Sequence, residues 1–167
     1  SGSGAPCLVA TVRARLREAV SLRRSVLGLP DHLTDAFRLV NREGDFLSGL
    51  AVDVIGPELV ARSSSLWTEL HRDAIEEQLI VAFAEVGPRP RVRWQSDVDA
   101  LAADGYEAHF GTPPRAAVEE RDASDASQVS VKELGVRYLV QPGLGKKTGH
   151  FVDQRENRGR LRSLVKS

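Results

Sequence analysis

FRLVNREGDFLSGLAVDVIGPELVARSS, residues 37–64, is the stretch that decides the predicted fold. It holds three short runs rich in β-branched and other apolar residues, and we expect Phe37 and Leu39 in the core. Glu43-Gly44-Asp45 separates the first run from the second, and Gly56-Pro57 separates the second from the third. Both separators are turn signals. The pattern therefore predicts a three-stranded meander.

A helix is predicted on each side of this meander. In residues 9–27 the apolar side chains recur at helical spacing with the arginines on other faces, and Gly28 and Pro30 then end the helix. Residues 66–86 show the same spacing and are closed by Gly87-Pro88. The meander is thus expected to have helices to pack against.

The second half of the chain alternates in the same way. Residues 91–95 predict a strand, and the stretch from there to about Ser127 has no clear pattern. Residues 128–142 predict a hairpin that turns near Leu134-Gly135, and a last helix is expected to start near Phe151. The whole order predicts an α+β fold with one antiparallel or mixed sheet and flanking helices.

The charge balance gives no overall attraction to nucleic acid. Lys plus Arg and Asp plus Glu number 23 each, so the formal net charge is zero. The positive charge is instead local, with arginines clustered in residues 13–24 and 155–162, while residues 119–125 are acidic. Any affinity for RNA is expected to come from such clusters.

The remaining bulk features exclude several classes of protein. A single cysteine, Cys7, excludes an internal disulfide and every multi-cysteine zinc pattern. No apolar run approaches the length of a membrane span. The opening SGSG resembles a cloning remnant. The arginine-rich residues 10–24 are compatible with an organelle import signal as well as with an amphipathic helix.

GLGKKTGHFVDQRENR, residues 143–158, begins like a phosphate-binding loop, but its spacing excludes one. A phosphate loop needs G-x-x-x-x-G-K-[ST], and here Val140 stands at the first glycine and Lys147 at the hydroxyl position. The dinucleotide pattern G-x-G-x-x-G fails as well, because Gly149 comes one place late. Neither nucleotide motif is present.

The polar residues that follow have two interpretations. Asp153, Asn157 and Arg160 recur at helical spacing, and Gln154 and Arg158 line the neighbouring stripe. Such a face can bind a zwitterion, whose carboxylate needs a guanidinium or helix amides and whose ammonium needs a carboxylate. A solvated helix with intrahelical ion pairs explains the same spacing.

Two separate stretches resemble one known family. KTGHFVDQRENR, residues 147–158, resembles the G-Q-K-T-G-x-F-L-D-Q-R-x-N-R signature of the bacterial-type ribosomal RNA large-subunit methyltransferase I family. Residues 37–56 resemble the R-L-V-x-x-E-G-D-x-L-P-G-L-x-V-D-x-Y-G motif of that family. The departures are Ser48, Ile55, Lys146 and Val152, of which Lys146 is the one expected to alter a polar contact.

The resemblance implies a function and a cofactor. Members of the family make 5-methylcytosine with S-adenosylmethionine, and the KTG…DQR segment implies the methionine end of the cofactor pocket. On this basis the expected cofactor-binding residues are Lys147, Thr148, Gly149, Phe151, Asp153, Gln154, Arg155, Asn157 and Arg158. The implied partners are RNA, in particular ribosomal RNA, and the implied location is the cytoplasm or an organelle with its own ribosomes.

The resemblance also implies a domain layout. Residues 1–8 are expected to be a tail, residues 9–142 a helix plus the central α+β subdomain, and residues 143–167 the truncated start of the methyltransferase domain. The catalytic Rossmann-like domain of the family and its catalytic cysteine are expected to be absent, because the sequence stops at Ser167, where the family continues into that domain. Cys7 is not expected to be that cysteine, because it precedes the matched region. The fragment alone is therefore expected to be inactive.

Other readings remain open beside this one. A stand-alone, non-catalytic module that binds RNA or a protein through its arginine clusters is the alternative, and a homodimer is a possible assembly. The four histidines show no metal-ligand spacing, so no metal is expected. Trp67 and Trp94 could stack on bases, although packing at the core or its rim explains them better. Asp45 and Asp53 are expected to be structural.

Overall fold

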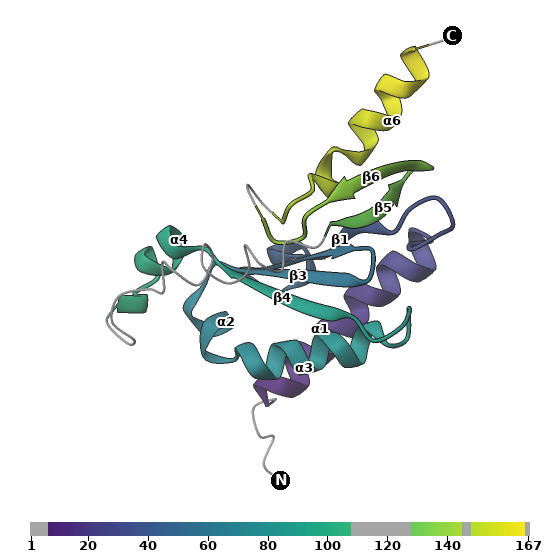
Figure 1. Cartoon of the computed structure of the whole chain (residues 1–167). Helices are drawn as coiled ribbons and strands as arrows, with labels where there is room; N and C mark the ends of the chain where they lie inside the picture. The colour runs from purple at the N-terminus through teal and green to yellow at the C-terminus, as the bar shows by residue number, and fades with distance from the viewer. Residues whose placement is uncertain (1–6, 108–127, 145–147, 166–167) are drawn as a thin grey trace.

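The computed structural model describes residues 7–107, 128–144 and 148–165, which form an α+β fold (Figure 1). The three runs of the meander become β1 (Ala36–Asn41), β2 (Leu50–Ile55) and β3 (Glu58–Ser63). They pair antiparallel in that order, so the predicted meander is confirmed. A 3-10 turn, η2 (Arg42–Asp45), joins β1 to β2.

A fourth strand makes the sheet mixed. β4 (Arg91–Ser96) pairs parallel with β3, and the sheet order is β1-β2-β3-β4. The parallel pairing needs a crossover, which α2 (Leu66–Leu70) and α3 (Arg72–Phe83) supply. The single helix predicted for residues 66–86 is thus wrong in its continuity, because His71 between them has a non-helical φ of −116°.

The two helices α1 and α3 cover one face of the sheet (Figure 1). α1 (Leu8–Ser21) continues into a π-helical turn, η1 (Leu22–Val26), which confirms most of the predicted N-terminal helix. Alternate strand residues point to these helices, so Phe37 and Leu39 lie in this core as expected. Trp67 and Trp94 pack partly buried at its rim, which agrees with their structural interpretation.

The predicted hairpin covers the opposite face, but it does not extend the sheet. β5 (Val129–Glu133) and β6 (Val136–Val140) pair only with each other, so the prediction of one sheet is wrong. Leu134 and Gly135 both have positive φ, 51° and 81°, as a two-residue mirror-image turn requires. The hairpin instead packs its apolar side chains Val131 and Val140 against the face of the four-stranded sheet. With both faces covered, all six residues of β2 are buried.

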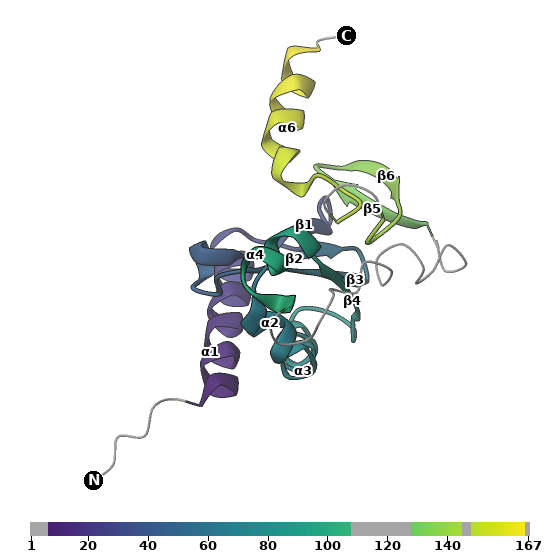
Figure 2. The ribbon, with the colours of Figure 1, turned by 90° about the vertical axis from the view of Figure 1, so that its left-hand side faces the viewer.

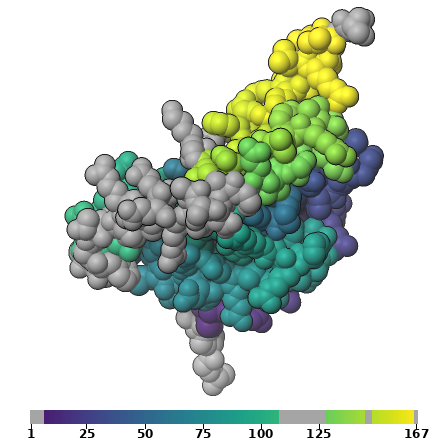
Figure 3. All heavy atoms as spheres, viewed as in Figure 1, coloured from purple at the N-terminus to yellow at the C-terminus, as the bar shows by residue number. Residues whose placement is uncertain are grey.

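The last described segment leaves the body of the molecule. A 3-10 turn, η4 (Val152–Gln154), precedes α6 (Arg155–Leu164), so the α-helix starts four residues after the predicted position. α6 buries none of its residues and projects beyond the hairpin in both ribbon views (Figures 1 and 2). The space-filling view shows the same helix standing out above β5 and β6 (Figure 3).

A short helix, α4 (Val98–Ala103), follows β4, and Asp97 caps it by accepting a hydrogen bond from the Ala100 amide. The acidic residues 119–125 and the predicted site residue Lys147 lie outside the described residues. Within the described ranges, no helix combines the length and the apolar character that crossing a membrane requires.

Candidate functional site

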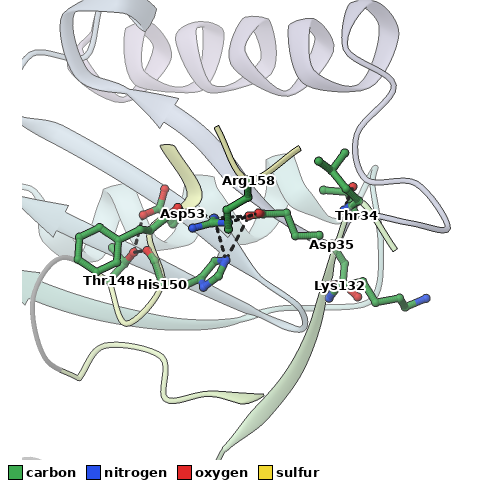
Figure 4. Close-up of polar contacts among 10 residues, drawn as sticks. Thr34, Asp35, Asp53, Lys132, Thr148, His150 and Arg158 are labelled. Atoms are coloured by element: carbon green, nitrogen blue, oxygen red, sulfur yellow. Dashed lines mark hydrogen bonds and ion pairs between the residues drawn. The ribbon is translucent and has the colours of Figure 1, made fainter. Parts of the chain in front are cut away.

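The KTG…DQR segment lies on the sheet face that the helices leave open. Thr148 Oγ1 donates a hydrogen bond of 2.5 Å to Asp53 Oδ2 in the middle of β2 (Figure 4). The Gly143 amide donates to the Thr148 carbonyl at 3.0 Å, and Gln95 Nε2 of β4 donates to the Gly143 carbonyl at 2.6 Å. The start of the segment is therefore fixed to two strands of the sheet.

Asp53 is the central group of this anchor. Its side chain is 1% exposed, and Arg38 Nε of β1 donates to its Oδ1 at 2.5 Å. Burial raises the pKa of Asp53, while Arg38 and the Thr148 hydroxyl act to lower it. Because all of its close partners are protein groups, Asp53 joins β1, β2 and the segment, which agrees with the structural role expected for it.

Gly149 is required by the path of the backbone at this point. Its φ is +92°, and a Cβ built on it would lie 2.1 Å from the Gln141 carbonyl oxygen. No side chain fits at that distance, and L residues rarely adopt that φ. Gly149, one of the expected cofactor-binding residues, is thus required for the backbone geometry of this turn.

A second buried cluster fixes the other end of the segment. Glu133, at the end of β5, is 1% exposed and accepts two hydrogen bonds from Arg158 of α6, at 2.5 and 2.7 Å. Figure 4 labels Arg158 and His150 of this cluster. His150 Nε2 lies 3.2 Å from Glu133 Oε2, and Arg158 also donates to the Phe151 carbonyl at 2.7 Å. Hydrogen bonding to Glu133 raises the pKa of Arg158, so the guanidinium stays charged.

The predicted site residues divide into two groups. Thr148 and Arg158 point inward, to Asp53 and Glu133, and the other described members stay at the surface. These are Phe151, Asp153, Gln154 and Asn157, which are exposed, and Arg155, which is half-buried. Asn157 Nδ2 donates to Gln154 Oε1 at 2.8 Å, and Asp153 lies in η4, so the predicted helical face begins only at Arg155.

The residues that hold the segment were only partly predictable. Nothing in the spacing singles out Glu133 or His150. Glu133 lies 25 residues before Arg158 and 17 residues before His150, so no local pattern connects these three residues. Asp53 carries a signal, since a carboxylate inside the apolar run LAVDVI must be paired if it is buried.

A cleft of about 510 Å³ lies beside this segment. Arginines from five different elements line it, with Asp153 as the carboxylate in its wall: Arg23, Arg38, Arg42, Arg62 and Arg155. Across the described residues, no group of three or more His, Cys, Asp or Glu side chains is placed to hold a metal ion.

Proteins of known name resemble the chain over most of its length. Ribosomal RNA large subunit methyltransferase I of Alteromonas mediterranea is 32% identical over 148 residues, which is 86% of this chain. The proteins of that name from Shewanella frigidimarina and Erwinia tasmaniensis are 30% and 34% identical, over 87% and 86% of the chain. The resemblance to this family is confirmed.

The chain spans about a third of the length of these curated relatives, 33% to 35%. No protein-family model matches the chain.

Two solved structures share the fold. One is a candidate S-adenosylmethionine-dependent methyltransferase from Streptococcus mutans, with a TM-score of 0.65 and 22% identity; the match covers 96% of this chain and 37% of that one. The other, a candidate methyltransferase in complex with S-adenosylhomocysteine, has the same TM-score and identity over 95% of this chain and 36% of that one. At this identity the likeness concerns the fold.

Proposed function

We propose that this chain is part of an S-adenosylmethionine-dependent methyltransferase that acts on ribosomal RNA, with C5 of cytosine as the methyl acceptor. The curated relatives support it by name, and the solved structures support it by fold. One observation carries the proposal. The KTG…DQR segment, on which the resemblance depends, is also the segment that Asp53 and Glu133 fix in place from both ends.

The two groups of site residues suggest two roles. Thr148, Gly149 and Arg158 shape the segment, because their side chains or backbone are committed to contacts within the protein. The exposed residues Phe151, Asp153, Gln154 and Asn157 form an edge of the cofactor pocket, together with Lys147. This edge fits the methionine end of the cofactor in its chemistry. Asp153 offers a carboxylate for the ammonium.

When bound, the cofactor supplies an activated methyl group, and the residues assigned above hold and orient its amino-acid end. The central sheet positions RNA beside that pocket. A protein with this role works where ribosomes are assembled, in the cytoplasm or in an organelle with its own ribosomes.

The test is a nucleoside comparison. Ribosomal RNA from the source organism, with and without the gene that encodes this chain, is digested and analysed by mass spectrometry. We expect a 5-methylcytosine to disappear on deletion and to return with the wild-type gene. Unchanged methylation would overturn the proposal and favour the alternative, a non-catalytic binding module.

A matched pair of variants tests the cofactor edge in the same strain. Asp153→Asn removes the proposed partner of the cofactor ammonium, whereas Glu156→Gln changes an exposed carboxylate in the first turn of α6. We expect Asp153→Asn to weaken cofactor binding by about 1.5–3 kcal/mol, the scale of a hydrogen bond to a charged group. Methylation then falls with Asp153→Asn and not with Glu156→Gln; equal methylation by both variants would remove Asp153 from the pocket.

A further inference from the structure

The arginine-lined cleft beside the segment has a composition that suits an anionic ligand. Its wall includes five guanidinium groups and one carboxylate, that of Asp153. The arginines come from elements far apart in the sequence, namely η1, β1, η2, β3 and α6. Only the fold brings them together, so the concentration of positive charge is a property of the tertiary structure.

Three of these arginines are held by carboxylates in or behind the wall. Arg38 pairs with Asp53 at 2.5 Å and Arg62 with Asp97 at 2.8 Å. Arg23 pairs with Asp45 at 2.5 Å, and both side chains of this last pair are less than 10% exposed. Such pairs fix the positions of the guanidinium groups and neutralise part of their charge.

Arg42 and Arg155 differ from the other three. They stand on different elements of the cleft wall, η2 and α6, and neither guanidinium forms an ion pair or hydrogen bond with the residues that the structure describes. Each is half-buried, so part of its hydration is already lost. Arg42 acts on the exposed Glu43 carboxylate through space and helps to lower its pKa. Two guanidinium groups in one cleft that form no direct ion pair within the described residues are a site for an anion with several acceptor oxygens.

The turn that presents Arg42 is held in an unusual conformation. Arg42 has a φ of 48° and Phe46 a φ of 56°, both in the left-handed region that non-glycine residues seldom occupy. The surrounding structure fixes it, because Asp45 accepts hydrogen bonds from both Arg23 and the Asn41 amide. Strain that is maintained in this way is typical of functional positions.

The same turn carries a feature that favours nucleic acid over other anions. Phe46 is 73% exposed, and Arg15 lies over its ring with 4.7 Å between the guanidinium carbon and the ring centroid. An exposed aromatic ring close in sequence to an unpaired arginine is the combination that single-stranded nucleic acids bind, through base stacking and phosphate contacts. An acidic peptide would use the arginines but would not need the ring.

We propose that this cleft binds a phosphate of the RNA backbone between Arg42 and Arg155, and that Phe46, at the end of the turn that presents Arg42, stacks on a base of the same strand. The proposal deepens the proposed function, since it assigns part of the RNA contact to named residues. It also gives Arg155, one of the residues expected at the cofactor, a different ligand. The cofactor edge then consists of the neighbouring residues of η4 and α6.

The test measures binding of the 167-residue chain to a fluorescent single-stranded RNA over a range of salt concentrations. Arg42→Ala and Arg155→Ala are compared with Arg17→Ala, an exposed arginine of α1 that does not line the cleft and that gives the same change in net charge. We expect each cleft variant to lose about 3- to 10-fold in affinity and about one unit of the salt slope, because one phosphate contact is removed. Arg17→Ala is expected to lose less than about 2-fold.

Three results would overturn the proposal: no RNA binding by the wild-type chain, equal losses in all three variants, or a loss confined to variants that have unfolded by circular dichroism. A parallel titration with inorganic phosphate separates the possible sources of the anion. Saturable phosphate binding without RNA binding would identify a small-anion site and also contradict the proposal. None of these results changes the nucleoside comparison, so the proposed methyltransferase function is tested independently.

Discussion

α3 and α6 are helices of similar length, 12 and 10 residues, that are held to the molecule in opposite ways. α3 buries Ile75, Leu79 and Phe83 against the sheet and α1. α6 buries no residue, and its large apolar side chains are open to solvent, with Leu161 63% and Leu164 78% exposed. The first helix is stabilised by its own apolar face.

The second helix depends on polar contacts along one face. Arg158 binds Glu133, and Arg162 donates to the Leu134 carbonyl at 2.7 Å. A helix of this length is marginal by itself in water, and most helical stability in proteins comes from an apolar face packed on a core. The comparison teaches that similar helix lengths conceal different stabilities. We therefore expect the segment nearest the proposed cofactor edge to be the least stable part of the described chain.

The largest expected effect on stability comes from shortening a buried apolar side chain of α3. Leu79→Ala removes a side chain that is 1% exposed, and we expect it to lower the free energy of unfolding by about 2–5 kcal/mol. Leu164→Ala in α6 is the matched control, with an expected change within about 0.5 kcal/mol. Urea denaturation followed by circular dichroism measures both. Similar losses in the two variants would mean that α6 is packed against something in solution.

An intermediate effect is expected from releasing α6. Arg158→Ala leaves Glu133 buried with His150 alone. We expect it to lower the free energy of unfolding by about 1–2 kcal/mol, less than for a fully buried pair, because the Arg158 side chain is 29% exposed. Amide exchange of residues 155–164 should then speed up about 5- to 30-fold. Arg160→Ala, an exposed arginine two residues further along the helix, serves as the control.

The wild-type chain tests the same comparison without a mutation. Residues 155–164 should exchange faster than α3, because they bury fewer side chains. If they exchange as slowly, α6 has another partner, most simply a second copy of the chain. A mass that rises with concentration in light scattering would then reveal the homodimer.

The smallest effect concerns Asp53, which links the sheet to the segment. Burial raises the pKa of Asp53 above its ordinary 3.8, so the folded chain holds this proton more tightly than the unfolded chain. The stability that Asp53 contributes is therefore full below the ordinary pKa and is lost as the pH rises through the raised one. The free energy of unfolding of the wild type minus that of Asp53→Asn should fall with pH over this window. A difference that rises with pH would show that Arg38 and Thr148 outweigh burial.

Local patterns predicted most of the elements. The meander of residues 37–64, the N-terminal helix and the hairpin with its turn at Leu134-Gly135 all form as expected, because turn residues and apolar periodicity act over short distances. The break at His71 was not predictable, since the apolar spacing continues across it. The separate two-stranded sheet was not predictable either, because the same strand pattern suits a sheet edge and a sheet face.

The candidate site was predictable in its location and not in its contacts. The resemblance pointed to KTG…DQR, and the structure places that segment against β2 and β5. The resemblance did not reveal that Thr148 and Arg158 point into the protein, nor that Arg155 and Arg42 line the same cleft. Such pairings link residues about 25 to 110 positions apart, for which local spacing carries no information.

By itself the sequence determined the α+β class, the order of helices and strands, and the resemblance to ribosomal RNA large-subunit methyltransferase I, because each depends on local pattern or on contiguous motifs. The tertiary structure alone decided which charged groups are buried in pairs and which stay free to bind a ligand. The physical reason is that a charge is stable inside a protein only beside a partner, and the partners of Asp53 and Glu133 are supplied by the fold.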